Sequence, residues 1–286
     1  MRKFFITFNQ KGYSMAMTKL ENKMVIDVHA HLGKSVSIRK GEVGGVVETT
    51  PEHLIKLMSL AKIDKAIISP IPGYPRPRGQ KDTMEQNDLV ANAVQKYPEK
   101  FPCGLGTVEP RDGEACLDEV DRIFKDLGLK GLMFHHLFQG IYLDHPIMFA
   151  ILKKASVYHP VVEVHVKEGS LLESPWRVAR VAKAYPGIKF IMAHPAIDVQ
   201  DLACSMDVAL NHKNVYLDTC IWHHHLSPLE TAVETIGADR ILFGSDLPYY
   251  EGESLDLAMV KNAKIPEEAK ELILSKNAIR IFDLSL

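Results

Sequence analysis

Residues 24–31 read MVIDVHAH, an apolar run interrupted by Asp27 that leads into His29 and His31. Such a run predicts a strand over Met24–Val28 that is buried on both faces, as in a parallel sheet. Side chains two positions apart in an extended chain point to the same side, so both imidazoles are expected to face one side together. The segment therefore predicts a buried strand whose carboxyl end presents a pair of histidines.

Working outward, short apolar runs alternate with longer segments of helical period along the chain. Thr50-Pro51-Glu52, for example, is a helix start signal, with a capping threonine and a proline in the first turn. The predicted strands are Met24–Val28, Lys65–Ser69, Phe101–Thr107, Leu129–Phe134, Pro160–Val164, Ile188–Ala193, Val215–Asp218 and Arg240–Gly244. Eight strands alternating with helices indicate the α/β class, and their number favours a closed (β/α)8 TIM barrel over an open doubly wound sheet.

The domain organisation is expected to be simple. No Gly-, Ser- or Pro-rich linker divides the chain, so we predict a single barrel domain over residues 24–286. Residues 1–23 are expected to form an N-terminal extension. Their basic start and short apolar stretch lack the length and cleavage site of a signal peptide, so the expected location is cytoplasmic.

Reactive side chains gather where the predicted strands end. His165 and His194 follow two apolar runs, and Asp246 lies just beyond the last of them. Active sites of (β/α)8 barrels lie at the carboxyl ends of the strands. Imidazoles and carboxylates suit zinc, manganese or iron(II), and such an ion brings the pKa of a bound water close to neutrality. One histidine at a strand end is more often a core residue, but four such positions together predict a catalytic metal site.

These motifs resemble the amidohydrolase superfamily. The resemblance is carried by VIDVHAH (residues 25–31), the histidine at 165, AHP (193–195) and ILFGSDLP (241–248), and it extends from about residue 24 to residue 283. The more similar branch is the amidohydrolase-related one, which includes aminocarboxymuconate-semialdehyde decarboxylase and resorcylate-type decarboxylases.

The resemblance implies particular roles for these residues. His29, His31, His165 and Asp246 would hold one divalent metal. His194 would orient or polarise the metal-bound water or the substrate, and Asp246 would double as a proton shuttle. Histidine suits acid–base work because its pKa lies near physiological pH.

The fourth predicted strand departs from the family pattern. Many relatives read GxKGxKxH here, and members with two metals often bridge them with a carboxylated lysine. This chain has Met133 at the second lysine position, and Lys130 lies at the wrong end of the strand. We therefore expect one metal ion, with zinc as the first choice and manganese as the alternative. His135 is expected either to contact the substrate or to be a buried polar support.

Candidate substrate contacts lie in two predicted loops. Arg76 and Arg78 belong to the Pro-rich segment PIPGYPRPRGQKD (residues 70–82), and arginine binds carboxylates with two parallel hydrogen bonds. This loop is expected either to bind an acidic substrate or to be a solvated surface. Trp222 either stacks on a substrate ring or packs beneath a lid. The adjacent histidines 223–225 are not expected to be ligands, because neighbouring residues rarely all face one ion.

Three functions fit these residues. The first expectation is a hydrolase that uses a metal-activated water on a small molecule. The alternative is a nonoxidative decarboxylase of an unsaturated or aromatic carboxylic acid, which needs the same ligands. A barrel that binds metal without catalysis is disfavoured, since the ligand set is intact.

Composition excludes several other partners. The 286-residue chain has a formal net charge of −2 and no basic run, which argues against nucleic acid. No apolar run approaches the ~18 residues needed to cross a bilayer. The four cysteines form no CxxC pair and are expected to be reduced thiols. Relatives of this kind are often dimers, so a homodimer is the expected oligomeric state.

Overall fold

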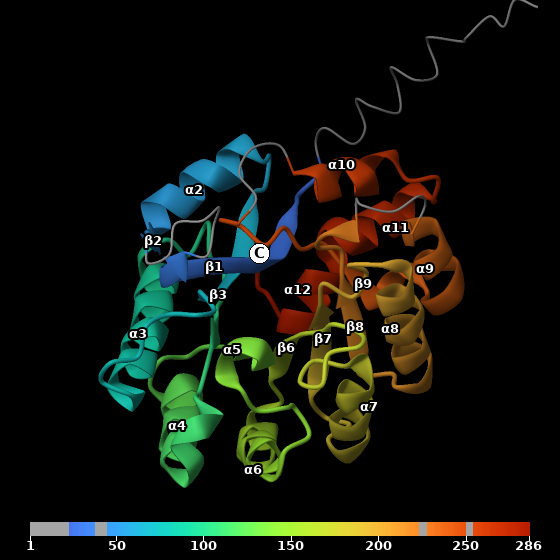
Figure 1. Ribbon diagram of the computed structural model, residues 1–286. Coiled ribbons are helices and arrows are strands. Elements are labelled where there is room, and N and C mark those ends of the chain that lie inside the picture. The colour runs from blue at the N-terminus through green and yellow to red at the C-terminus, as the bar shows by residue number, and fades with distance from the viewer. Residues whose placement is uncertain (1–22, 38–44, 223–227, 250–253) are drawn as a thin grey trace, which may run out of the picture.

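The computed structural model describes residues 23–37, 45–222, 228–249 and 254–286. Strands form the centre of the molecule and helices surround them (Figure 1). The eight parallel strands are β1 (Ile26–Ser37), β3 (Lys65–Pro70), β4 (Leu105–Gly106), β5 (Gly131–Phe134), β6 (Val161–His165), β7 (Lys189–Ala193), β8 (Val215–Asp218) and β9 (Ile241–Leu242). Each lies where the sequence predicts a strand, although several are shorter than expected.

The strands close into a barrel. Strand β1 pairs with β3, and strands β4 to β9 pair in chain order. Two parallel bridges join these sheets: Ile68 pairs with Gly104, and Ala30 pairs with Leu247, beyond β9. The His31 amide donates to the Leu247 carbonyl at 2.8 Å across the second junction. The predicted (β/α)8 TIM barrel, formed by a single domain, is thus confirmed.

The outer layer consists of helices that follow the strands. They are α2 (Pro51–Leu60), α3 (Gln80–Lys96), α4 (Leu117–Lys125), α6 (Pro146–Ala155), α7 (Pro175–Ala184), α8 (Val199–Asn211) and α9 (Pro228–Ile236). Apolar faces of these helices pack on the outside of the strands; Leu54, Leu57 and Met58 of α2 are examples. Thr50 caps α2 by accepting from the His53 amide, as its sequence predicts.

Some elements were not predicted. Strand β1 continues to Ser37 and pairs antiparallel with β2 (Gly45–Thr49). This extension reads LGKSVS, which mixes polar and apolar residues and lacks the continuous apolar run of the other strands. Helices α5 (His136–Gln139) and α10 (Leu255–Asn262) were also missed. At the C-terminal end of the chain, α11 (Glu267–Glu271), a π-helical turn (Leu272–Lys276) and α12 (Asn277–Phe282) are continuous.

The barrel interior is closed at one end and polar at the other. Apolar side chains inside the barrel pack against Ala278, Ile281 and Phe282 of α12, which covers the amino ends of the strands. The carboxyl ends carry the buried histidines and carboxylates described below. The buried histidines and carboxylates of the barrel interior therefore lie at its carboxyl rim.

The expected N-terminal extension falls outside the described residues except for Lys23. The Lys23 ammonium lies 3.1 Å from Glu267 and 3.0 Å from Glu271. None of the helices in the described ranges has both the length and the apolar character of a membrane-crossing segment.

Candidate active site

The two histidines of the opening motif lie together inside the barrel. A register shift in β1 between Asp27 and Ala30 contains His29 and comes directly before His31. The Asp27 carboxylate supports this bulge, because it accepts from the His29 amide at 2.9 Å and from the Ser245 amide at 3.0 Å. Both histidines are buried, and their Nε2 atoms are 3.1 Å apart.

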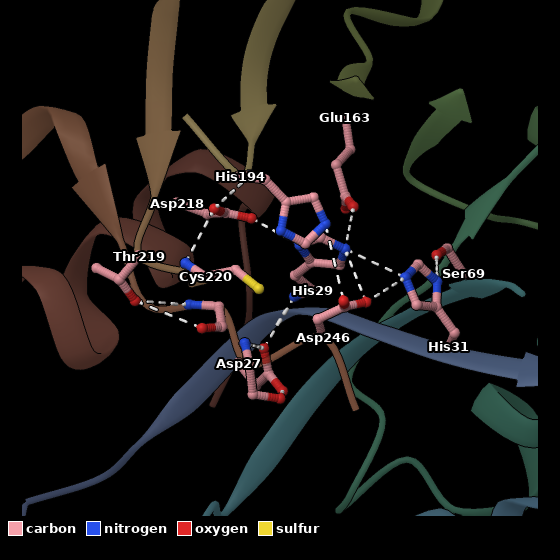
Figure 2. A network of polar contacts seen from close by, with 12 residues as sticks. Asp27, His29, His31, Ser69, Glu163, His194, Asp218, Thr219, Cys220 and Asp246 are labelled. Atoms are coloured by element: carbon pink, nitrogen blue, oxygen red, sulfur yellow. Dashed lines mark hydrogen bonds and ion pairs between the residues drawn. The ribbon is translucent and has the colours of Figure 1, made fainter. Parts of the chain in front are cut away.

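Asp246 lies next to this pair, on the segment after β9 that closes the barrel against β1. Its amide donates to the His29 carbonyl at 2.8 Å, and its backbone is left-handed, with φ of 58°. Left-handed residues other than glycine are uncommon and concentrate at functional sites. Asp246 Oδ1 lies 3.2 Å from His31 Nε2 and 3.5 Å from His29 Nε2. Three buried side chains thus converge (Figure 2).

The three converging atoms fit one divalent ion. Bonds of about 2.1 Å that meet at tetrahedral or right angles place neighbouring ligand atoms roughly 3.0–3.4 Å apart. The distances from 3.1 to 3.5 Å among His29, His31 and Asp246 are close to that spacing. Two imidazoles and a carboxylate form a donor set that suits zinc or manganese.

Neighbouring groups orient both imidazoles. Asp218 Oδ2 lies 2.7 Å from His29 Nδ1, and Ser69 Oγ lies 2.9 Å from His31 Nδ1. With a proton on Nδ1, each Nε2 presents a lone pair, which is the arrangement found around metal-bound histidines. Gly244 permits the close packing, since a Cβ there would lie 3.1 Å from both Asp218 Oδ2 and His29 Cβ.

His194 lies beside this cluster at the end of β7. Its amide donates to Asp218 at 3.2 Å, and its Nε2 lies 3.8 Å from Asp246 Oδ2. Its backbone is left-handed, with φ of 57°. Burial, reinforced by the neighbouring His165, moves the pKa of His194 well below its usual value. His194 is therefore a neutral imidazole within reach of Asp246.

His165 occupies the opposite side of His194. Their ring centroids are 4.7 Å apart, and His165 is not part of the close cluster formed by His29, His31 and Asp246. The His165 ring stacks on His135, with centroids 3.9 Å apart. Burial, together with His165, lowers the pKa of His135 to about 4. The structure thus brings all four expected ligands to one region, with His165 farther from the other three.

A buried glutamate, Glu163, was missed by the sequence analysis. It lies two residues before His165 on β6, is 2% exposed, and has Oε1 3.5 Å from His29 Nε2. Its Oε2 has no hydrogen-bond partner within the described part of the chain. Burial raises the pKa of Glu163 to about 8. Burial also disfavours the charged form of His29, but Glu163, Asp218 and Asp246 outweigh it and raise the His29 pKa well above its usual value.

Two neighbouring cavities open at the carboxyl rim. The cavity of about 260 Å³ is lined by the candidate ligands, His194 and Glu163, and the other, of about 270 Å³, by Arg76, Glu109 and Arg111 among others. His135, Met133, Pro72 and Phe138 line both. A small molecule bound near the histidines therefore has a second polar space beside it.

The candidate substrate residues differ in their placement. His135 lines both cavities, and Arg76 lines the second, where it pairs with Asp112 at 2.6 Å and Glu109 at 3.3 Å. Arg78 lines neither, because Asp82 and Glu85 hold it at the surface with half of its side chain exposed. Trp222 is fully buried in the apolar core and lines neither cavity. Histidines 223–225 lie outside the described residues.

Several polar residues of the site were not singled out in the sequence, among them Asp218, Glu163 and Glu173, the last of which lies beside His135 and His165. Asp218 is the last residue of a predicted strand, so it could have been found, like His165, by looking for reactive side chains at strand ends. Glu163 is a charged residue within an apolar strand, in register with His165, which is a usable signal. Glu173 lies in the segment between β6 and α7, where no periodic pattern indicates which way a side chain points.

Comparisons with known proteins identify the family of this chain. Residues 26–284 match the amidohydrolase family. The chain is 22% identical over 278 residues to 2-amino-3-carboxymuconate-6-semialdehyde decarboxylase of Dictyostelium discoideum, covering 82% of this chain and 77% of that protein.

Solved structures with the same fold include two decarboxylases. One is 2,6-dihydroxybenzoate decarboxylase from Rhizobium, with a TM-score of 0.69, 20% identity and coverage of 91% of this chain and 99% of that one. The other is a dihydroxybenzoic acid decarboxylase from Polaromonas sp. JS666 with bound manganese and the inhibitor 2-nitroresorcinol. Its TM-score is 0.72, with 19% identity and coverage of 91% and 97%.

These findings correct one expectation from the sequence. The first expectation, a hydrolase, is wrong: the relatives described here with named activities are decarboxylases, which agrees with the lyase alternative. The error arose because both reactions use the same ligand set at the same rim. Because the family match spans nearly the whole barrel, the chain belongs to the amidohydrolase family and is an enzyme of that superfamily.

Proposed function

We propose that this protein is a metal-dependent, nonoxidative decarboxylase of a small unsaturated or aromatic carboxylic acid. The observation that carries the proposal is the convergence of His29, His31 and Asp246 at distances of 3.1 to 3.5 Å beside a cavity of about 260 Å³. Similarity to decarboxylases of carboxylic acids supports this reaction class.

The same residues would hold the ion. His29, His31 and Asp246 form the close cluster, and His165 is the proposed fourth ligand. A bound divalent ion supplies Lewis-acid stabilisation of the negative charge that develops on the substrate. Manganese has the stronger support, because a relative of the same fold binds it, while zinc remains the alternative. The absence of a lysine at position 133 supports one ion rather than two.

The reaction also needs a protein residue that delivers a proton to the substrate. Loss of carbon dioxide breaks a carbon–carbon bond and leaves its electron pair on the substrate carbon, which takes up one proton. Asp246 is the proposed carrier: its carboxylate would take up a proton from solvent water in the cavity and pass it to that carbon. Its Oδ2 lies 3.8 Å from His194 Nε2, while its Oδ1 faces the other histidines. Neutral His194 would orient the substrate through a hydrogen bond.

The reaction class is tested by product analysis. Purified protein loaded with manganese or zinc is incubated with a panel of aromatic and unsaturated acids, and carbon dioxide is measured beside the loss of one carboxyl group by mass spectrometry. A parallel panel of esters, lactones and amides serves as the control. We expect carbon dioxide from at least one acid and no hydrolysis. Hydrolysis without carbon dioxide release would refute the proposal.

Asp218→Asn tests the support of His29. An amide in place of the carboxylate weakens the hold on the His29 Nδ1 proton, 2.7 Å away. Loss of such a partner lowers metal affinity by about 10–100-fold. Affinity is measured by competition with a chromophoric chelator, and Asp239→Asn, at the opposite end of the barrel, is the matched control. An unchanged affinity in Asp218→Asn would contradict this role.

A further inference from the structure

Glu173 is a buried carboxylate that the proposed reaction does not use. It lies between β6 and α7 and is 4% exposed. Its Oε1 accepts from the Leu137 amide at 2.8 Å, which anchors it to the first turn of α5. The two oxygens face two different histidines: Oε1 lies 2.9 Å from His135 Nδ1, and Oε2 lies 3.1 Å from His165 Nδ1.

The two histidines are arranged as a pair. Their rings stack nearly parallel, with centroids 3.9 Å apart and planes 14° apart. Each Nδ1 is buried and makes no hydrogen bond of good geometry in the described ranges, and Glu173 is the charged group within ion-pair distance of both. Since an ionised carboxylate only accepts hydrogen bonds, a proton on each Nδ1 is the arrangement in which Glu173 can serve both rings.

Both rings belong to the wall of the cavity that holds the candidate ligands. His135 and His165 both line the cavity that holds the candidate ligands, whereas Glu173 lines neither cavity at the rim. With the protons on the Nδ1 side, each Nε2 keeps its lone pair. One carboxylate can therefore determine which nitrogen carries the proton in both rings, one directly after β5 and the other at the end of β6.

We propose that Glu173 is a positioning residue that fixes His135 and His165 together in the Nδ1-protonated tautomer. His165 Nε2 is thereby available as a metal ligand, and His135 Nε2 becomes an acceptor for a hydroxyl or amino donor of the substrate beside the ion. The consequence for the reaction rests on the proposed function, but the tautomers belong to the protein alone. They can be measured without metal or substrate.

The test is ¹⁵N NMR of histidine side chains in the metal-free protein. In the wild type we expect the resonances of His135 and His165, assigned with His135→Asn and His165→Asn variants, to report Nδ1-protonated neutral rings. In Glu173→Gln the side-chain amide donates to one Nδ1, so at least one ring is expected to switch tautomer. Glu168→Gln, the same charge change in the same segment, is the control and should leave both rings unchanged.

Metal affinity gives a second readout. Glu173→Gln should weaken binding of Mn²⁺ by about 10–100-fold, as expected for loss of a ligand-orienting partner. Wild-type rings with the proton on Nε2, or unchanged tautomers and affinity in Glu173→Gln, would overturn the proposal. So would a second Mn²⁺ bound by the wild type and lost in the variant, because Glu173 would then be a ligand. A protein with the predicted tautomers but no carbon dioxide release would fail only the proposed function.

Discussion

Replacing Asp246 with asparagine is expected to lower kcat for carbon dioxide release by roughly a thousandfold, within the range found for lost acid–base groups. Asparagine keeps the shape of the side chain but can neither take up nor release a proton. It also removes the negative charge that lies 3.2 Å from His31 Nε2 and 3.5 Å from His29 Nε2. Activity is measured per bound metal ion, so that a loss of metal is separated from a loss of chemistry.

A matched control for this variant is Asp144→Asn. Asp144 is also a buried carboxylate, but it pairs with Arg177 and Arg180 on the outside of the barrel. The control is expected to keep kcat while losing some stability. An Asp246→Asn enzyme that keeps more than about a tenth of the wild-type rate, with full metal content, would exclude Asp246 as the proton carrier.

His194→Ala is expected to keep the metal and lose about 10²- to 10⁴-fold in kcat. His194 is buried next to Asp246 but lies outside the cluster of His29, His31 and Asp246. Its buried Nδ1 has no hydrogen-bond partner in the described part of the chain, so its removal leaves no broken bond at that atom. Elemental analysis and kinetics on the same preparation check both parts of the expectation.

Loss of metal in His194→Ala would have a different meaning. It would place His194 among the ligands, in line with its ring centroid distance of 4.8 Å from His29. Retention of both metal and activity would leave His194 without a role in the reaction. The two readouts thus separate a ligand, a catalytic residue and a bystander.

Much of the fold was predictable because burial on both faces imposes a simple pattern. Parallel strands inside a barrel contact apolar groups on both sides, so runs such as those ending at His165 and His194 stand out in the sequence. The β2 hairpin partner of β1 was not predictable in this way. Strand β2 pairs with the polar extension of β1. This pairing is made by the backbone, and the side-chain pattern of the extension does not reveal it.

The site was predictable to the extent that it depends on strand ends. His29, His31 and Asp246 follow directly from that rule, because parallel strands bring their carboxyl ends to one rim. Loops have no such rule. Arg78 does not line the cavities, because its guanidinium forms ion pairs with Asp82 and Glu85. Trp222 packs into the apolar core. Pairwise contacts of this kind depend on loop conformation, which the spacing of residues in the sequence does not encode.

The most direct test of the account is a metal titration of the metal-free protein, with carbon dioxide release measured at each step. If one ion at His29, His31, His165 and Asp246 supports cleavage of a carbon–carbon bond, the metal-free protein is inactive and the rate rises linearly to a plateau at one equivalent of Mn²⁺ or Zn²⁺ per chain. Undiminished carbon dioxide release without metal, or a plateau reached only at two equivalents, would contradict it.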